Sequence, residues 1–120
     1  MNIESFDSDR DRAHVHRIWE EVGWLDPTNE GNVDGTNAII DAGRAWVSRL
    51  NDEAECLVLC SEGTIRYLDE DIAFSGLTGV TTSRVGRKQG LAARLTSHAI
   101  AQEAKDGALV SGLGMFEQGF

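Results

Sequence analysis

The chain has 120 residues, of which 41% are hydrophobic and 26% are charged, and its formal net charge is −9. This length suits one small domain, and the composition excludes intrinsic disorder. A net negative charge repels nucleic acid and anionic membranes, and no apolar run is long enough to cross a bilayer. We therefore expect no nucleic acid or membrane partner and a cytoplasmic location.

The N-terminal segment is predicted to form a strand followed by a helix. Residues 2–6 alternate weakly, as in a strand, and Ser8 is a candidate helix N-cap. The apolar residues that follow recur at helical spacing: Val15, Ile18, Trp19 and Val22. Gly23 is expected to end this helix, whose apolar stripe would pack on the core.

The middle of the chain is predicted to hold a loop, a short helix and several antiparallel strands. Residues 24–36 contain the only proline together with several Gly, Asn and Asp residues, which favours a loop. Residues 37–42 would form a short helix, and a strand should begin at Ala45. Three further segments are rich in apolar and β-branched residues and are predicted to be strands: 54–60, 63–68 and 73–82.

Polar residues and glycines mark the connections between these strands. Turns are expected at 51–53 and 68–72, and 61–63 is expected to be a turn or a bulge. Inside the last strand, Gly76 and Gly79 indicate a bulge or a place where something approaches the backbone closely.

The two cysteines, Cys56 and Cys60, lie in one apolar run, CLVLC. On a strand this spacing puts both side chains on one face but too far apart for an unstrained disulfide. We expect two reduced, buried thiols. The histidines are dispersed, and the consecutive acids of 69–71 are typical of a solvated turn, so no metal site is expected.

Positive charge is concentrated in the segment RVGRKQGLAARLT, residues 84–96, although the chain as a whole is acidic. No acidic residue occurs between Asp71 and Glu103, so this segment is a local basic island. Apolar residues at four-residue spacing predict a helix over 91–105, and 108–113 should be a short buried strand. A helix N-terminus leaves backbone N–H groups unpaired and attracts anions, so the island is a candidate phosphate site.

Several readings of this segment compete. A P-loop is excluded, because Gly86 and Gly90 enclose only three residues and Leu91 follows in place of the lysine. A GxGxxG dinucleotide fingerprint is absent as well. The pattern [RQ]xxGx[GA] is satisfied by Arg87-Lys88-Gln89-Gly90-Leu91-Ala92. A solvated basic loop that caps a helix, or a phosphate binder of unrelated fold, remains an alternative.

In its strand-to-helix context this motif resembles that of the GNAT acyl-CoA N-acyltransferases, and within them the N-terminal part of the enhanced-intracellular-survival acetyltransferases. The resemblance runs from LTGVTT to GMFEQGF, and covers residues 1–70 only by element order. It implies an α+β (mixed α/β) fold with a central, mostly antiparallel sheet flanked by helices. Residues 1–120 would form a single partial domain, the cofactor-binding half, without the last helix and strands.

The resemblance also implies a site for acetyl-CoA as cosubstrate. The strand backbone of Val80, Thr81 and Thr82 would pair with the pantetheine arm. The diphosphate would lie on backbone N–H groups, with charge from two side chains; these residues are Arg87, Lys88, Gln89, Gly90, Leu91 and Ala92. Arg84 and Arg94 would not take part.

The activity that the resemblance implies is transfer of an acetyl group to a primary amine, on a small molecule or a lysine, by direct attack. Relatives continue beyond Phe120 with a tyrosine that protonates the leaving thiolate, so no catalytic residue is assigned, and Tyr67 matches a strand position instead. The acidic surface favours a cationic acceptor. The alternative is a non-catalytic acyltransferase-like binding or interaction module, including a homo-oligomer paired through an exposed sheet edge.

Overall fold

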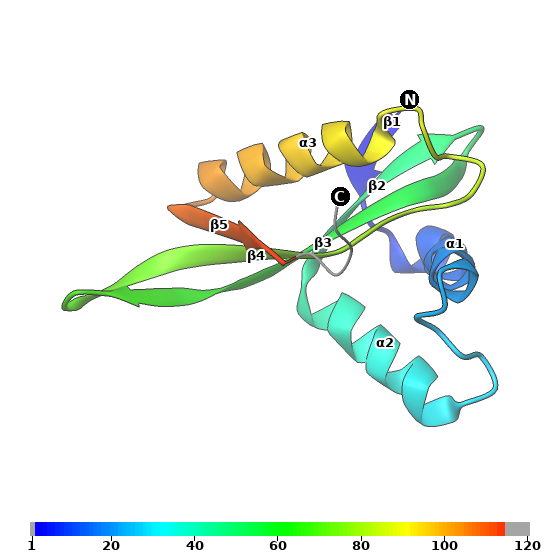
Figure 1. The fold of residues 1–120 in the computed structure, drawn as a ribbon, viewed down its shortest axis with the longest axis horizontal. Coiled ribbons are helices and arrows are strands. Elements are labelled where there is room, and N and C mark those ends of the chain that lie inside the picture. The colour runs from blue at the N-terminus through cyan, green and yellow to red at the C-terminus, as the bar shows by residue number, and fades with distance from the viewer. Residues whose placement is uncertain (1, 115–120) are drawn as a thin grey trace.

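The structure, a computed structural model that describes residues 2–114, is built around a five-stranded sheet in the order β1-β2-β3-β4-β5 (Figure 1). The strands are β1 (Asn2–Ser5), β2 (Arg44–Leu50), β3 (Glu53–Tyr67), β4 (Glu70–Thr82) and β5 (Val110–Leu113). The helices are α1 (Ser8–Glu21), α2 (Glu30–Ala42) and α3 (Leu91–Lys105). Neighbouring strands are antiparallel except β4 and β5, which are parallel and joined through α3. The predicted α+β class and mostly antiparallel sheet are confirmed.

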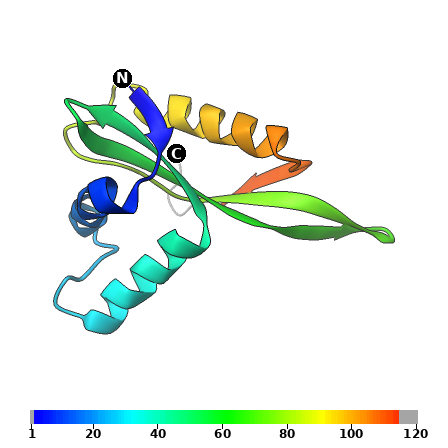
Figure 2. The ribbon, with the colours of Figure 1, turned by 180° about the vertical axis from the view of Figure 1, so that it is seen from behind.

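Helices cover both faces of the sheet: α1 and α2 lie on one side and α3 on the other (Figures 1 and 2). The apolar residues of β3 pack against helices on both faces of the sheet, because successive strand side chains point to opposite faces. Leu57 and Leu59 pack with Val15, Ile18 and Trp19 on the α1 side. The alternate positions pack with α3, in a cluster that includes Cys56, Val58, Cys60, Leu91, Leu95 and Ala99. None of the helices in residues 2–114 is long and apolar enough to span a membrane.

The cap of α1 differs by one residue from the prediction. Ser8 is the first helical residue, and Asp7 is the N-cap, whose carboxylate accepts hydrogen bonds from the N–H groups of Asp9 and Arg10 at 2.9 and 3.2 Å. An aspartate and a serine cap helices about equally well, so tertiary context decides between neighbours. Gly23 ends the helix in a left-handed conformation with φ of +82°, as its position predicts.

The prediction of a loop over 24–36 is wrong in its second half. Helix α2 begins at Glu30, capped by the Asn29 side chain, which accepts from the N–H of Asn32 at 3.0 Å. Two glycines and two aspartates inside the helix weaken its intrinsic propensity. The helix is nevertheless formed, with Thr36 and Ile40 buried.

The predicted interruption at 61–63 is also wrong, because β3 pairs with β4 without a break from Cys60 to Tyr67. Residues 61–63 are polar or small because both faces of β3 are exposed from Ser61 onward, where the strand is held mainly by its backbone ladder with β4. The two strands form an arm that projects beyond the helices (Figure 1). The chain reverses within Leu68 and Asp69, and β4 already begins at Glu70, so the turn is shorter than predicted.

Helix α3 has the predicted bounds, but the strand after it is not buried. Within the described residues β5 pairs only with β4 and forms an edge of the sheet. Val110 and Leu113 are 43% and 47% exposed. The buried strand predicted from the apolar composition of 108–113 is therefore wrong in its burial.

Cys56 and Cys60 are both free and buried, which confirms the predicted thiols. Burial raises the pKa of each above its ordinary value of 9.0. We therefore expect neither thiol to react with Ellman's reagent at pH 8 in the native protein, and both to react in guanidinium chloride, because the thiolate is the nucleophile. Rapid labelling without denaturant would contradict this packing.

Candidate anion-binding site and adjoining pocket

The C-terminal half of β4 contains a bulge at Gly79 and Val80. Leu59 lies opposite Thr78 and Leu57 opposite Thr81, so two β4 residues face Val58 alone. Gly79 has φ of +61°, a conformation that glycine adopts without strain. Of the two alternatives predicted for Gly79, a bulge or a close approach to the backbone, the structure shows the bulge.

The bulge is fixed by a tryptophan of α1. The indole Nε1 of Trp19 donates to Thr81 Oγ1 at 3.0 Å, and that hydroxyl donates to the carbonyl oxygen of Gly79 at 3.0 Å. A Cβ atom on Gly79 would lie 3.0 Å from the Cζ2 atom of Trp19. The absence of a side chain at Gly79 therefore lets the ring pack directly on the strand.

We expect Gly79→Ala to lower the free energy of unfolding by about 1–2 kcal/mol, because alanine is strained at positive φ and its Cβ would press on Trp19. The control is Gly63→Ala in the same sheet, where a Cβ meets nothing within 4 Å and φ is not positive. The measurement is urea unfolding of both variants; equal stabilities would show that the bulge tolerates a side chain.

One edge of β4 is open beyond the bulge. The parallel partner β5 pairs with residues 74–77 only, and no other strand of the described chain pairs with that edge from Thr78 onward. The N–H of Ser83 donates to the carbonyl of Glu55 at 2.8 Å. Because backbone groups alternate in direction along a strand, the N–H and C=O of Thr82 point to the open edge, where an extended ligand could pair with them.

The N-terminus of α3 offers unused backbone donors. Gly90 is the N-cap, with φ of +77° and no side-chain cap. Within residues 2–114 the N–H groups of Leu91, Ala92 and Ala93 have no hydrogen-bond acceptor, and the first to have one is that of Arg94, at 3.2 Å from the Gly90 carbonyl. Lys88 is also left-handed, with φ of +62°. A helix N-terminus preceded by such a turn is a concave anion-binding surface.

Gly86 brings the strand end and the helix start together. Its N–H donates to both the carbonyl and the hydroxyl oxygen of buried Ser83, each at 3.1 Å. A Cβ on Gly86 would lie 3.0 Å from Thr82 Cγ2 and 3.1 Å from Leu91 Cδ1. The predicted site residues thus flank one short loop: Val80, Thr81 and Thr82 before it, and Arg87, Lys88, Gln89, Gly90, Leu91 and Ala92 in it or just after.

The side chains of these residues differ in their surroundings. Arg87, Lys88 and Gln89 are exposed on the loop, whereas Leu91 is buried and could contribute only its backbone. Thr81 is buried as well, and by the same alternation its N–H and C=O face Leu57 of β3, not the open edge. Neither Arg87 nor Lys88 forms an ion pair within the described residues. Their charge is therefore available to an anion.

Acidic side chains beside the loop are engaged by other groups. Glu21 accepts from the backbone N–H of Arg84 at 3.1 Å and pairs with Arg17 at 3.4 Å. Arg17 also pairs with buried Glu55 at 2.9 Å. This partnering reduces the repulsion that these carboxylates would exert on a phosphate.

A pocket of about 500 Å³ lies beside the bulge, on the face covered by α1 and α2. It is lined by Trp19, Trp24, Gly31, Asn32, Gly35, Thr36, Ile39, Leu59, Thr78 and Gly79. The rings of Trp19 and Trp24 meet edge to face, with centroids 5.7 Å apart. None of the lining residues is ionisable.

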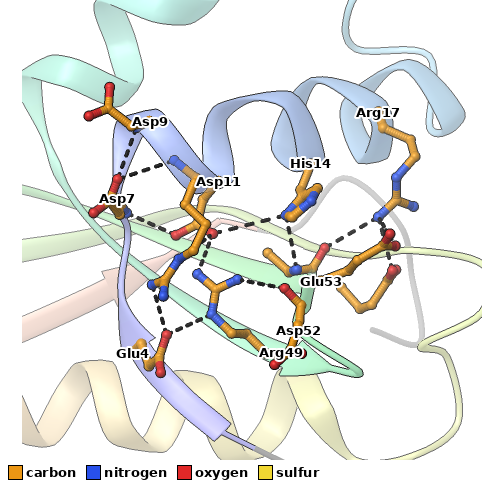
Figure 3. Close-up of polar contacts among 12 residues, drawn as sticks. Glu4, Asp7, Asp9, Asp11, His14, Arg17, Arg49, Asp52 and Glu53 are labelled. Atoms are coloured by element: carbon orange, nitrogen blue, oxygen red, sulfur yellow. Dashed lines mark hydrogen bonds and ion pairs between the residues drawn. The ribbon is translucent and has the colours of Figure 1, made fainter.

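An extended polar cluster joins β1, α1, β2 and the start of β3 (Figure 3). Arg49, which is 5% exposed, donates to Glu4 at 2.6 Å and also pairs with fully buried Asp11. Asp11 accepts in addition from the N–H of Asp7 at 2.9 Å, and His14 Nδ1 accepts from the N–H of Ala54 at 3.2 Å. Because its members satisfy one another, this cluster is structural. Among residues 2–114, no group of three or more His, Cys, Asp or Glu could hold a metal.

The pocket-lining residues of α1 and α2 were not identified from the sequence as a site. The sequence predicts Trp19 to be a core residue, and it is 5% exposed, but it also lines the pocket. The clearest signal was Trp24, a tryptophan in a polar segment, which is 43% exposed.

Comparison with solved structures identifies the fold. A GNAT family acetyltransferase of Staphylococcus aureus superposes with a TM-score of 0.76 over 99% of this chain and 90% of its own, at 13% identity. The aminoglycoside N-acetyltransferase AAC(6')-Iy, solved in complex with CoA, gives 0.72 over 98% and 81%, at 12% identity. A transcriptional regulator from Bacillus halodurans C-125 gives 0.74 over 98% and 83%, at 18% identity.

The protein therefore has the fold of the GNAT acetyltransferases. No protein-family model matches the sequence, and no curated protein matches it either. At these identities the likeness concerns the fold alone, and the function has to be argued from the site.

Proposed function

We propose that this protein is an N-acetyltransferase domain that transfers the acetyl group of acetyl-CoA to a primary amine by direct attack. The observation that carries the proposal is the N-terminus of α3, whose first three N–H groups have no acceptor within the described residues and follow a strand with an open edge. The CoA complex of a protein with the same fold supports the choice of cosubstrate.

The residues present fit coenzyme A in shape and in charge. The unused donors and the cations Arg87 and Lys88 suit a diphosphate, since charge-assisted hydrogen bonds to phosphate are strong. A Cβ on Gly90 would meet no protein atom within 4 Å, so the space before the helix is open. The open edge of β4 leads from this loop to the bulge, and suits the amides of the pantetheine arm.

Acetyl-CoA would supply an activated acetyl group: the new C–N bond forms as the C–S bond breaks, the amine gives up a proton and the departing thiolate takes one. The chain would contribute positioning. The loop and α3 would hold the diphosphate, and Thr82 would pair with the arm. The pocket beside Gly79 would hold the amine next to the same edge, which gives the advantage of proximity.

One observation favours the alternative of a non-catalytic binding module. The sole tyrosine, Tyr67, is 62% exposed and pairs with Glu70 at the tip of the projecting arm, at the opposite end of β4 from Thr82. It therefore does not contribute an acid to the site, and the pocket has no ionisable lining residue. On this alternative, coenzyme A binds and no acetyl group is transferred.

Two measurements on the 120-residue chain decide between these functions. Isothermal titration with coenzyme A should show saturable binding that weakens as salt rises, because the diphosphate contributes charge. Incubation with acetyl-CoA and an amine should give an acetylated amine by mass spectrometry. Binding without transfer favours the module, and no binding by the folded protein overturns both.

A further inference from the structure

We infer that the pocket beside the bulge selects an amine carried on an aromatic or branched aliphatic body, and not a polycationic one such as an aminoglycoside or a polyamine. This inference rests on the proposed function, since it names the acceptor class for that reaction. It departs from what net charge suggests, because the acidic surface by itself favours a cationic acceptor.

The walls of the pocket are mainly apolar and aromatic. The lining includes Trp19 and Trp24, whose rings have an interplanar angle of 64°, and Leu59 of β3. On α2, Ile39 is 55% exposed, although its neighbour Ile40 is buried in the core. Indole rings next to an exposed isoleucine give a surface on which a ring or branched chain gains most from leaving water.

The lining of the pocket, which contains no carboxylate, argues against a polycation. A second ammonium group inside it would face no carboxylate among the lining residues, and an unpaired buried charge is costly. The carboxylate of Asp26, close in sequence to Trp24, is engaged by Thr28, which donates from both its N–H and its hydroxyl at 3.0 and 2.7 Å.

A few polar residues of the pocket would orient a bound amine. Thr78 lies on β4 immediately before the bulge, at the edge where the reaction would take place. Asn32 and Thr36 lie on α2, and the Oδ1 atom of Asn32 already accepts from the N–H of Asp26 at 2.7 Å. An amine placed at Thr78 and Gly79 would therefore have its apolar body between the tryptophans and Ile39.

The test compares 2-phenylethylamine with spermidine and kanamycin on the full chain. Binding is followed by tryptophan fluorescence, with and without coenzyme A, and acetylation by mass spectrometry with acetyl-CoA. We expect 2-phenylethylamine to bind at least tenfold more tightly than either polycation. Ile39→Asn should weaken its binding about tenfold, as loss of one apolar contact does. The matched control is Ile100→Asn on α3, also a partly exposed helical isoleucine, at 40% exposure, outside the pocket.

The outcomes separate the two proposals. If coenzyme A binds but spermidine or kanamycin is preferred, or if both asparagine variants act alike, the acceptor inference is overturned and the proposed function stands. If 2-phenylethylamine binds and Ile39→Asn alone weakens it, the pocket assignment is supported even where coenzyme A fails to bind. Failure of coenzyme A to bind would overturn the proposed function only.

Discussion

Reversing both loop charges, by Arg87→Glu together with Lys88→Glu, is expected to weaken coenzyme A binding at least 100-fold, or about 2.7 kcal/mol. Each cation would make a charge-assisted contact with phosphate worth about 1.5–3 kcal/mol, and each replacement adds repulsion. Both side chains are exposed and have no ion-pair partner in the described structure, so the fold should be unaffected. Titration calorimetry at low salt measures the effect.

The matched control, Arg94→Glu together with Lys105→Glu, changes the net charge by the same amount, but on α3 and outside the loop. Both residues are exposed, and Lys105 lies in the last turn. We expect less than a fivefold loss, since solvent screens charges that do not touch the ligand. An equal loss in the two double variants would show that general attraction, and not the loop, governs binding.

Replacing Arg49 by methionine is expected to cost about 3 kcal/mol of unfolding free energy. Asp11 is fully buried and Arg49 nearly so, and removing one member of a buried ion pair leaves the other charge without compensation. The control is Arg66→Met on the projecting arm, where Arg66 and Asp71 are 3.2 Å apart and 64% and 60% exposed. Exposed pairs contribute less than about 1 kcal/mol, so that variant should unfold near the wild-type urea midpoint.

The same network predicts sensitivity to acid. The hydrogen bond from Arg49 holds the pKa of Glu4 below its ordinary value of 4.5. The stabilisation is therefore complete above about pH 4.5 and is lost as pH falls through the lowered pKa. Stability measured from pH 6 to pH 3 should fall less steeply in Arg49→Met than in the wild type; parallel profiles would contradict the assignment.

Features that depend on neighbouring residues are predictable from the sequence. The spacing of Leu91, Leu95 and Ala99 gave the helix, and Gly90 its start, because helix periodicity and capping are local. Gly79 indicated a bulge or a close approach to the backbone, because a glycine inside a strand is a local signal, although Trp19 of α1 fixes the bulge. The sequence-based prediction of secondary structure is wrong where contacts between distant residues override weak propensities. This is so at the glycine-containing start of α2 and where β3 continues to pair with β4 through Gly63.

The sequence by itself determined the strand, basic loop and helix in which the phosphate site is proposed, because all of its residues lie between Val80 and Ala92 and need only local geometry to meet. The tertiary structure alone decided the pocket. Trp19, Ile39 and Gly79 come from α1, α2 and β4, and only the packing of both helices on one face of the sheet brings them together. Burial of their apolar neighbours drives that packing, and it cannot be inferred from spacing along the chain.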